Sequence, residues 1–454
     1  MTYAQRIADY VAGLKIEDIP ESTRHKASLC LIDYLAAAWN AQGHPLAEKY
    51  VRLTMAMSGK GSGDASAIGS GLKLPPAWAA FANAAQGHIT ETDDGHRTSI
   101  MHIGTVVIPV VLALAESRKL TGARIMEALV CGYDVAIRSG ECFGPEHYGI
   151  FHTTATAGTF GAAAAAAKAM NLPPQAVAWA LGHAGTQASG LWQFLNENAV
   201  QAKPFHPAKA ALAGMISAML AESGIEGAVE IFEGKKGFCA IASKKPQYNA
   251  LVDKLGSEFK IDEVNFKGYP TCGQTHSMLD AMAAILSRER FSADEVAEVE
   301  ARVYQRAVDI AGIPDPEILE EAKFSNQFCL AFMISRGTLS FLNFTEEAIG
   351  DQKLRGLAKK VRLVVDPEMD AGFPAARPCR IIVRLNDGRS FSQENKFRKG
   401  DPENPMDAAA MQEKFAQLTG ASLGDSQRRQ ILDWCLKLEK VSTVEPWIFE
   451  PMKA

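Results

Sequence analysis

The residue types best suited to proton transfer are concentrated in one short segment, GHITETDDGHRTSIMHIG at residues 87–104. Seven titratable side chains fall within 15 residues, and three of the chain's ten histidines are among them. Histidine changes charge near neutral pH, and a neighbouring carboxylate shifts its pKa. The segment is therefore equipped for general acid–base chemistry. The same residue types bind metals, but their spacing matches no standard metal-binding pattern. A solvated loop is the alternative interpretation. The seven residues are His88, Glu91, Asp93, Asp94, His96, Arg97 and His102.

A second histidine group, EHYGIFHTTATAG at residues 146–158, comes directly before an alanine-rich run. It contains His147, Tyr148 and His152. Alanine favours helix, and a helix N-terminus carries unpaired N–H groups and positive potential, so a substrate carboxylate could bind there. The alternative is that His152 or a neighbouring threonine only caps the helix.

Two further turns carry cations and a thiol. QAKPFHPAKAA at 201–211 contains Lys203 and His206 between prolines that force a turn. FKGYPTCGQTHSMLDA at 266–281 contains Lys267, Cys272 and His276 before a helical run. A helix N-terminus would favour the thiolate of Cys272, although a buried, inert thiol is the more frequent state of a single cysteine. Surface lysines that only confer solubility are the alternative for the turns.

Composition and missing motifs exclude several classes of function. The net charge of −5 leaves no excess of cations for phosphates, so nucleic-acid binding is not expected. The eight cysteines include no CxxC pair, which disfavours zinc and iron–sulfur sites and fits a reducing cytoplasm. No P-loop, HExxH, GxSxG or strand-associated GxGxxG is present. Metal-free acid–base catalysis remains.

The elements that must position these groups are mainly helical. Apolar periodicity predicts helices to about residue 286, including the alanine-rich run from Thr153 to Met170. An uncharged stretch, 175–196, is expected to be buried or partly buried helix and not a membrane span. Residues 297–304, 359–366 and 379–385 read as strands, with a hairpin turn at Asn386-Asp387-Gly388. We therefore predict a mainly α protein: a large all-helical domain, 1–265 plus 405–454, and an inserted smaller α+β domain, 266–404, with a mostly antiparallel sheet.

Taken together, the motifs resemble the MmgE/PrpD family over nearly the whole chain. The segments that carry the resemblance are GHITETDD with HIGTVVIPVVLALAE, GIFHTTATAGTFGAAAAAAKAM, AKPFHPAKAAL with EGKKGF, KGYPTCGQTH, AKFSNQFCLAF and KGDPENPM. The family includes 2-methylcitrate dehydratase, cis-aconitate decarboxylase and iminodisuccinate epimerase. The resemblance implies a cytoplasmic homodimer that acts on a small polycarboxylate without a metal or organic cofactor, and without nucleic-acid or membrane partners.

The resemblance also implies roles for individual residues. All three family reactions move a proton at a carbon next to a carboxylate. The expected catalytic residues are His152, Lys203, His102, Cys272 and Asp93. The expected substrate-binding residues are Glu91, Asp94, Arg97, Tyr148, Lys267 and His276.

Several positions depart from the decarboxylase pattern of the family. Glu91 and Gly95 replace an aspartate and a threonine around the Asp-Asp pair, Cys272 stands where a histidine is expected, and Phe328 replaces a tyrosine. These differences argue against decarboxylation. The leading expectation is a hydro-lyase of the 2-methylcitrate dehydratase type. The altered acidic loop and Cys272 favour an epimerase or racemase of an iminodisuccinate-like acid as the alternative, and a non-catalytic paralogue is the third interpretation.

Overall fold

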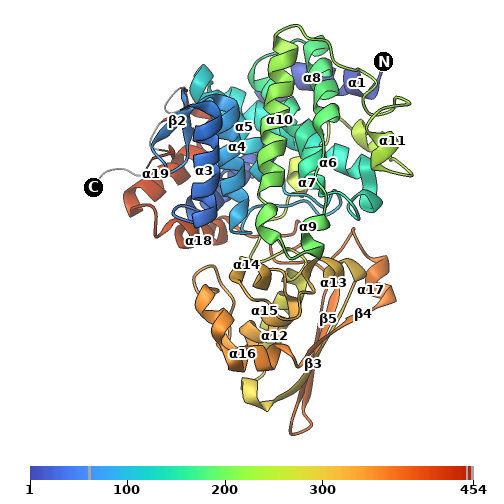
Figure 1. The fold of residues 1–454 in the computed structure, drawn as a ribbon, viewed down its shortest axis with the longest axis vertical. Coiled ribbons are helices and arrows are strands. Elements are labelled where there is room, and N and C mark those ends of the chain that lie inside the picture. The colour runs from blue at the N-terminus through green and yellow to red at the C-terminus, as the bar shows by residue number, and fades with distance from the viewer. Residues whose placement is uncertain (60–62, 446–447, 451–454) are drawn as a thin grey trace. The chain divides into compact units, whose positions relative to one another are not determined.

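The computed structural model describes residues 1–59, 63–445 and 448–450. The chain divides into two compact units (Figure 1). The helical unit comprises residues 1–196, 201–264 and 409–454, and the mixed unit comprises residues 197–200 and 265–408. The prediction of a mainly α protein with a smaller α+β part is confirmed.

The alanine-rich helix α7 (Thr153–Ala169) forms the centre of the helical unit, and all of its residues are buried. It packs against the helices α5, α6, α8 and α10. Small side chains permit this close packing: a Cβ added to Gly161 would lie 2.5 Å from the Cβ of Ala136 on α6. The predicted helix is therefore present, and it brings its neighbours near enough to build a site at its N-terminus. The bounds of the four neighbours are α5 (Gly104–Arg118), α6 (Gly122–His147), α8 (Pro174–Gln187) and α10 (Phe205–Glu222).

Helices from both ends of the chain complete the helical unit. The N-terminal helix begins with a capping box at Thr2, which satisfies backbone donors of its first turn. The predicted C-terminal helices are present, and they belong to this unit. A two-stranded antiparallel hairpin was not predicted, because its strands have only three residues each. The elements are α1 (Tyr3–Gly13), α2 (Glu21–Asn40), α3 (Pro45–Ser58), β1 (Ala65–Ala67), β2 (Leu72–Leu74), α4 (Pro76–Ile89), α9 (Gln193–Asn196), α11 (Cys239–Ala242), α18 (Ala408–Thr419) and α19 (Asp425–Leu436).

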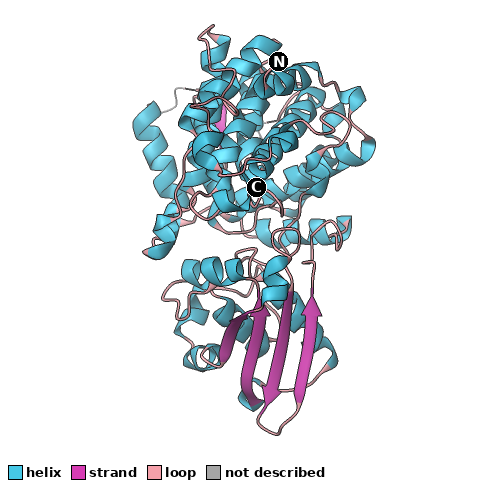
Figure 2. Cartoon of the chain, turned by 90° about the vertical axis from the view of Figure 1, so that its right-hand side faces the viewer, coloured by secondary structure: helices cyan, strands magenta, loops and turns pink. Residues whose placement is uncertain are grey.

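The mixed unit is built on a four-stranded sheet with helices against it (Figure 2). The strand order is β4-β3-β5-β6. The β3–β5 and β5–β6 pairs are antiparallel and β3–β4 is parallel, so the prediction of a mostly antiparallel sheet is confirmed. The predicted hairpin joins β5 to β6, and Gly388 adopts φ 92° in its turn. The strands are β3 (Val296–Val303), β4 (Val361–Val365), β5 (Cys379–Leu385) and β6 (Ser390–Asn395).

The helices of the mixed unit bury an apolar core that includes α12, α15 and α16. The helices α14 and α15 are separate: Lys323 is the C-cap of α14, and the side chain of Ser325 caps α15 by accepting from the N–H of Phe328. The bounds are α12 (His276–Arg288), α13 (Gln305–Ala311), α14 (Leu319–Ala322), α15 (Asn326–Arg336), α16 (Gln352–Ala358) and α17 (Pro367–Ala371).

Within the described residues, no helix has the length and apolar character needed to cross a bilayer. The uncharged stretch at 175–196 forms most of α8, an extended segment and α9. The stretch is partly buried, and α8 ends at Gln187.

Candidate active site

The acidic loop, residues 90–103, lies between the buried helices α4 and α5 of the helical unit. His88 occupies the last turn of α4, and Gly104 begins α5, so the loop is held at both ends. The carboxylate of Asp93 reaches two histidines: its Oδ2 lies 2.7 Å from Nδ1 of His88 and 3.4 Å from Nδ1 of His102. A single carboxylate therefore orients two rings.

His102 is the more accessible of these two histidines, with a side chain 18% exposed compared with 0% for His88. Its Nδ1 donates to the backbone carbonyl of Asp94 at 2.7 Å. Because a carbonyl only accepts, Nδ1 carries the proton, and in the neutral ring the lone pair is on Nε2. The loop thus fixes the tautomer in which His102 can act as a base through Nε2.

The side chain of Asp94 anchors the loop to α5 and α6. Its side chain accepts from the hydroxyl of Tyr133 at 2.6 Å and from the backbone N–H of Gly104 at 2.9 Å. Burial, followed by the charge of Asp33, raises the pKa of Asp94 to about 7. Gly104 is required here, since an added Cβ would lie 2.7 Å from the Tyr133 oxygen and 2.9 Å from Oδ2 of Asp94. In the structure the Asp94 side chain positions the loop and its carbonyl positions His102.

A lysine from the C-terminal helix α18 also holds the loop. Lys414 donates to Oδ1 of Asp33 at 2.6 Å and to the carbonyl of Thr92 at 2.7 Å. The side chains of Lys414 and Asp33 are 1% and 0% exposed. This buried ion pair ties α2, α18 and the residue that precedes Asp93.

His152 lies at the N-terminus of α7, facing the acidic loop. It occupies the N-cap position, but its side chain makes no capping hydrogen bond. Instead its Nδ1 lies 3.0 Å from Nδ1 of His206 on α10, and its ring packs on Trp192 at 4.3 Å between centroids. Burial lowers the pKa of His152 well below its usual value, and the neighbouring His206 and Lys203 lower it further. The buried ring is therefore neutral near pH 7.

Lys203 and Glu91 form a buried ion pair beside these histidines, with side chains 4% and 5% exposed. Glu91 has a left-handed backbone with φ 58°, which is uncommon for a residue other than glycine. Strained backbone of this kind is concentrated at functional sites. The expected cation and the expected acid of the loop are thus brought together and bind each other.

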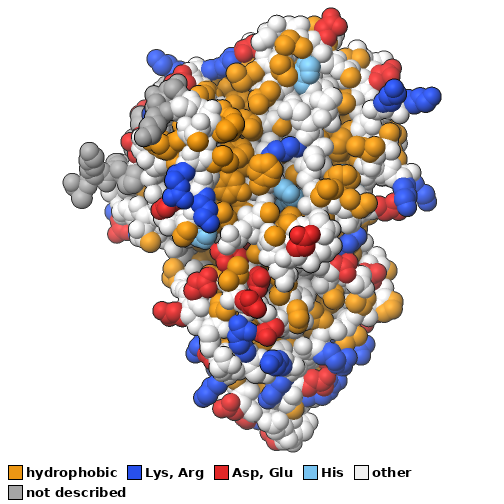
Figure 3. Space-filling model, viewed as in Figure 1, with side chains coloured by type: hydrophobic (Ala, Val, Ile, Leu, Met, Phe, Trp, Pro, Cys, Tyr) orange, Lys and Arg blue, Asp and Glu red, His pale blue; other side chains and the backbone are white. Residues whose placement is uncertain are grey.

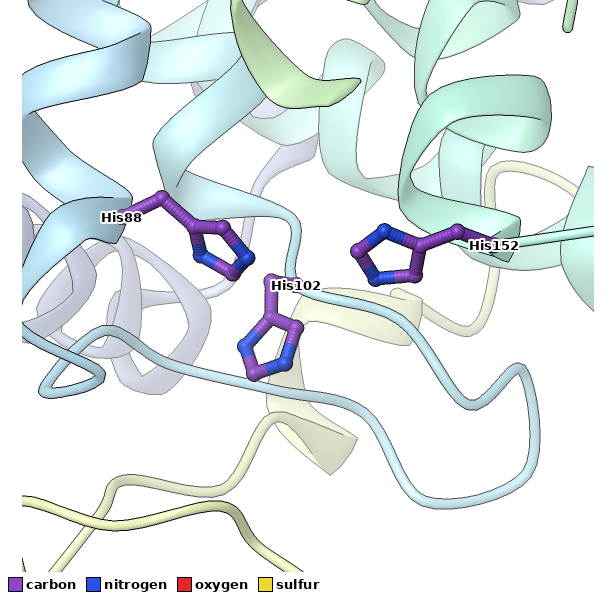
Figure 4. A group of neighbouring side chains, drawn as sticks. All are labelled: His88, His102 and His152. Atoms are coloured by element: carbon purple, nitrogen blue, oxygen red, sulfur yellow. The ribbon is translucent and has the colours of Figure 1, made fainter. Parts of the chain in front are cut away.

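The three histidines of the site lie close together (Figure 4). His88 and His152 point toward each other across a common space, and His102 lies beside that space. Ring centroids are 4.8 Å apart for His88 and His102, 6.0 Å for His88 and His152, and 6.3 Å for His102 and His152. One nitrogen of each ring lies within 4.8 Å of one nitrogen of each of the other two.

Other predicted residues of the helical unit lie around this cluster or apart from it. Tyr148 is buried and packs edge-on against Trp192, at 5.2 Å between ring centroids. Arg97 is half-buried in the loop. His96 has a different role, because its Nε2 contacts Glu263 at 3.2 Å and its Nδ1 contacts the hydroxyl of Ser99 at 2.9 Å.

The remaining predicted residues belong to the mixed unit. Lys267, Cys272 and His276 are buried and lie along the segment that leads into α12. The N–H of Cys272 donates to the carbonyl of Lys323 at 2.9 Å, and Nε2 of His276 donates to the carbonyl of Thr271 at 3.2 Å. The His276 ring packs edge-on against Tyr269. The segment is an ordered, hydrogen-bonded turn.

Sequence reasoning did not assign roles to His206, Trp192 or Lys414, and it named His88 only as a member of the polar segment. The sequence does contain a feature that points to His206, because this residue shares a Pro-bounded turn with Lys203. No local feature points to Lys414, because its partner Asp33 lies 381 positions away along the chain.

Comparisons with known proteins identify the class. The MmgE/PrpD N-terminal domain matches residues 5–251, and the MmgE/PrpD C-terminal domain matches residues 269–438. The chain belongs to the MmgE/PrpD family, as its motifs predicted.

Among its relatives are enzymes named cis-aconitate decarboxylase. The protein from Aspergillus terreus is 26% identical over 470 residues, which cover 97% of this chain and 94% of that protein. The proteins from Mus musculus and Homo sapiens are each 27% identical, over 431 and 434 residues; these cover 90% of this chain and 85% and 86% of the relatives. The chain is therefore similar over most of its length to enzymes of the lyase class.

Proposed function

We propose that this protein is an enzyme that moves a proton at a carbon next to a carboxylate of a small di- or tricarboxylic acid. The observation that carries the proposal is the convergence of His102 and His152 in one buried cluster with Asp93 and Lys203. The lyase relatives support the reaction class.

The chemistry requires a base near neutral pKa and a means of stabilising the charge that develops on the carboxylate side. His102 is the proposed base, because its hydrogen bond to Asp94 leaves the lone pair on Nε2. Asp93 stabilises the positive ring that forms when His102 takes the proton. Arg97 and Lys203 are the proposed carboxylate-binding cations of the helical unit, and Lys203 would exchange its partner Glu91 for the substrate.

Dehydration of a 2-methylcitrate-like hydroxy acid is the leading reaction. The proton and the hydroxyl leave from neighbouring carbons, so an acid and a base close together on one side can serve both. The close approach of one nitrogen of His102 to one of His152, within 4.8 Å, fits this arrangement. Two groups astride a single carbon, as an epimerase needs, would stand about 5–6.5 Å apart at ordinary reacting distances. The epimerase alternative therefore needs a second acid, for which Cys272 or Lys203 is the proposed residue.

Decarboxylation of a cis-aconitate-like acid is the second candidate. The names of the relatives favour it. The departures from the decarboxylase pattern of the family at Glu91, Gly95 and Cys272 argue against it.

A panel experiment separates these reactions. The full-length protein is incubated in deuterated water with 2-methylcitrate, citrate, cis-aconitate and iminodisuccinate, and the acids are followed by NMR. A new vinylic signal without loss of carbon dioxide indicates dehydration. Release of carbon dioxide indicates decarboxylation, and α-deuterium exchange with inversion indicates epimerisation. No change in any of the acids would refute the proposal.

Variants assign the residues within the panel. Lys203→Ala should abolish turnover whether the reaction is dehydration, decarboxylation or epimerisation. An active variant would show that the role given to Lys203 is wrong. Cys272→Ser should cost an epimerase most of its turnover but leave a dehydratase largely active. Lys267→Ala and His276→Gln test the remaining substrate-binding predictions, through a rise in KM.

A homodimer is proposed for the assembly. Large hydrophobic residues are exposed on α3 and α10, and Figure 3 shows hydrophobic side chains gathered over α3, α4 and α10. Exposed apolar patches of this kind often mark association surfaces. They include Leu53, Met57, Phe205, Ile216 and Met219. Light scattering should give twice the chain mass of 49.0 kDa, and Met219→Glu should lower it; a wild-type monomer would refute the proposal.

A further inference from the structure

We propose that His88, His102 and His152 bind a divalent transition-metal ion of the Zn²⁺ or Co²⁺ type, and that the ion inhibits the enzyme. Three imidazoles with one open position form a ligand set that suits these ions. The binding half of the proposal is independent of the reaction proposed above. The inhibition half rests on the proposed function, because the ion would occupy His102 and His152.

The hydrogen bonds around the three histidine rings resemble those around the ligands of a metal centre. Metal-ligating histidines usually use one ring nitrogen for the metal and the other for a hydrogen bond to a carboxylate or a carbonyl. Here Nδ1 of His88 contacts Asp93 at 2.7 Å, and Nδ1 of His102 donates to the carbonyl of Asp94 at 2.7 Å. Nδ1 of His152 is engaged by His206 at 3.0 Å. In all three rings, Nε2 is the nitrogen opposite the orienting bond.

His88 supplies an independent observation. Its Nε2 is buried and has no hydrogen-bond partner among the described residues. Burying such a group without a partner costs about 1–3 kcal/mol, and neither the fold nor the proposed reaction explains it. A metal ion in the space between the rings would satisfy it.

Distance and charge are compatible with binding. Nitrogens about 2.0–2.1 Å from a tetrahedral ion stand about 3.4 Å apart. The three rings offer nitrogens within 4.8 Å of one another, so small side-chain rotations complete the site. Asp93 adds a negative charge beside two of the ligands, and the positive charge of Lys203 is balanced by Glu91.

The test uses cobalt as the probe on the full-length protein, freed of metals with a chelator. Binding should produce visible ligand-field absorption that saturates at one equivalent and disappears when Zn²⁺ is added. His88→Asn and His102→Asn should each abolish the signal, while the exposed control His25→Gln keeps it. Asp93→Asn should weaken binding about 10–100-fold, because His88 and His102 lose the carboxylate that orients them.

Two results would overturn the proposal. The first is the absence of visible absorption in the wild-type protein. The second is unchanged absorption in His88→Asn or His102→Asn, provided that the variant has the tryptophan fluorescence of the wild type and is therefore folded. Inhibition is measured separately, with turnover expected to fall as the cobalt signal rises and to return with chelator. Full turnover at saturating cobalt would refute the inhibition half and the roles of His102 and His152, while the metal site itself would stand.

Discussion

The buried pair of Lys414 and Asp33 allows the sharpest prediction about the loop that carries the site. Replacing Lys414 by Met removes the cation at 2.6 Å from Asp33 and the hydrogen bond to the carbonyl of Thr92. Both side chains are fully enclosed, so water cannot replace the lost partner. Removing one partner of a buried pair costs about 3–5 kcal/mol, because the other charge stays buried. After the loss of Lys414, the charge of Asp33 still faces Asp94, whose pKa it already raises.

Urea unfolding followed by tryptophan fluorescence measures this cost within one unit, since all six tryptophans lie in the sequence of the helical unit. At an m-value of about 2–3 kcal/mol/M, the midpoint of Lys414→Met should fall by about 1–2 M. The matched control is Lys437→Met, which breaks an ion pair with Asp433 whose side chains are 63% and 62% exposed. It should change stability by about 0–1 kcal/mol.

The double variant Asp33→Asn with Lys414→Met completes the cycle. Because it removes both charges, it should recover at least half of the lost stability. A cost below about 1 kcal/mol for Lys414→Met alone, or a double variant less stable than the single one, would refute the reasoning that this pair anchors the acidic loop.

Three further predictions concern the same loop. Asp93→Asn should lower kcat by roughly 10²-fold or more, measured by substrate turnover, because His102 loses its stabilising carboxylate; a wild-type kcat would contradict this. The pKa of Asp94 is raised from 3.8 to about 7, so between these values the native state holds a proton that the unfolded chain releases. The stability that Asp94 contributes is therefore present at low pH and is lost as the pH rises through 4–7. Asp94→Asn should flatten that part of the urea-midpoint profile, and an unchanged slope would count against the assignment. Gly104→Ala should destabilise the helical unit by about 1–3 kcal/mol through overpacking, while Gly13→Ala, which adds a Cβ with nothing within 4 Å, should not; equal urea midpoints would be evidence against the packing argument.

Most of the architecture was predictable because it depends on local patterns. The alanine run specified α7, and β-branched runs with an Asp-Gly turn specified the β5–β6 hairpin. The pairing of strands that are distant in the sequence was harder to predict, because nothing in the sequence of β4 shows that it lies parallel to β3. The short hairpin β1–β2 has too few residues for an alternating pattern to be recognised.

The site follows the same rule. His102, His152 and the acidic loop could be proposed from the sequence because each lies in a motif that is visible locally. The position of His88 against Asp93, the contact of the Trp192 ring with His152 and the hydrogen bond from Lys414 to Thr92 are products of packing. Sequence also assigned substrate binding to Asp94 and Glu91, whereas their contacts in the structure are to Tyr133 and Lys203. That substrate-binding prediction remains to be tested.

The central claim is that His102 exchanges a proton with a carbon next to a carboxylate. The most direct measurement is the rate at which deuterium placed on the carbon next to the carboxylate of the converted acid is lost to solvent water under single-turnover conditions, compared among wild type, His102→Asn and the exposed control His25→Gln. The account predicts loss of the label with wild type and His25→Gln, and a rate of loss lower by about 10²–10⁴-fold with His102→Asn. Equal rates in all three proteins would contradict it.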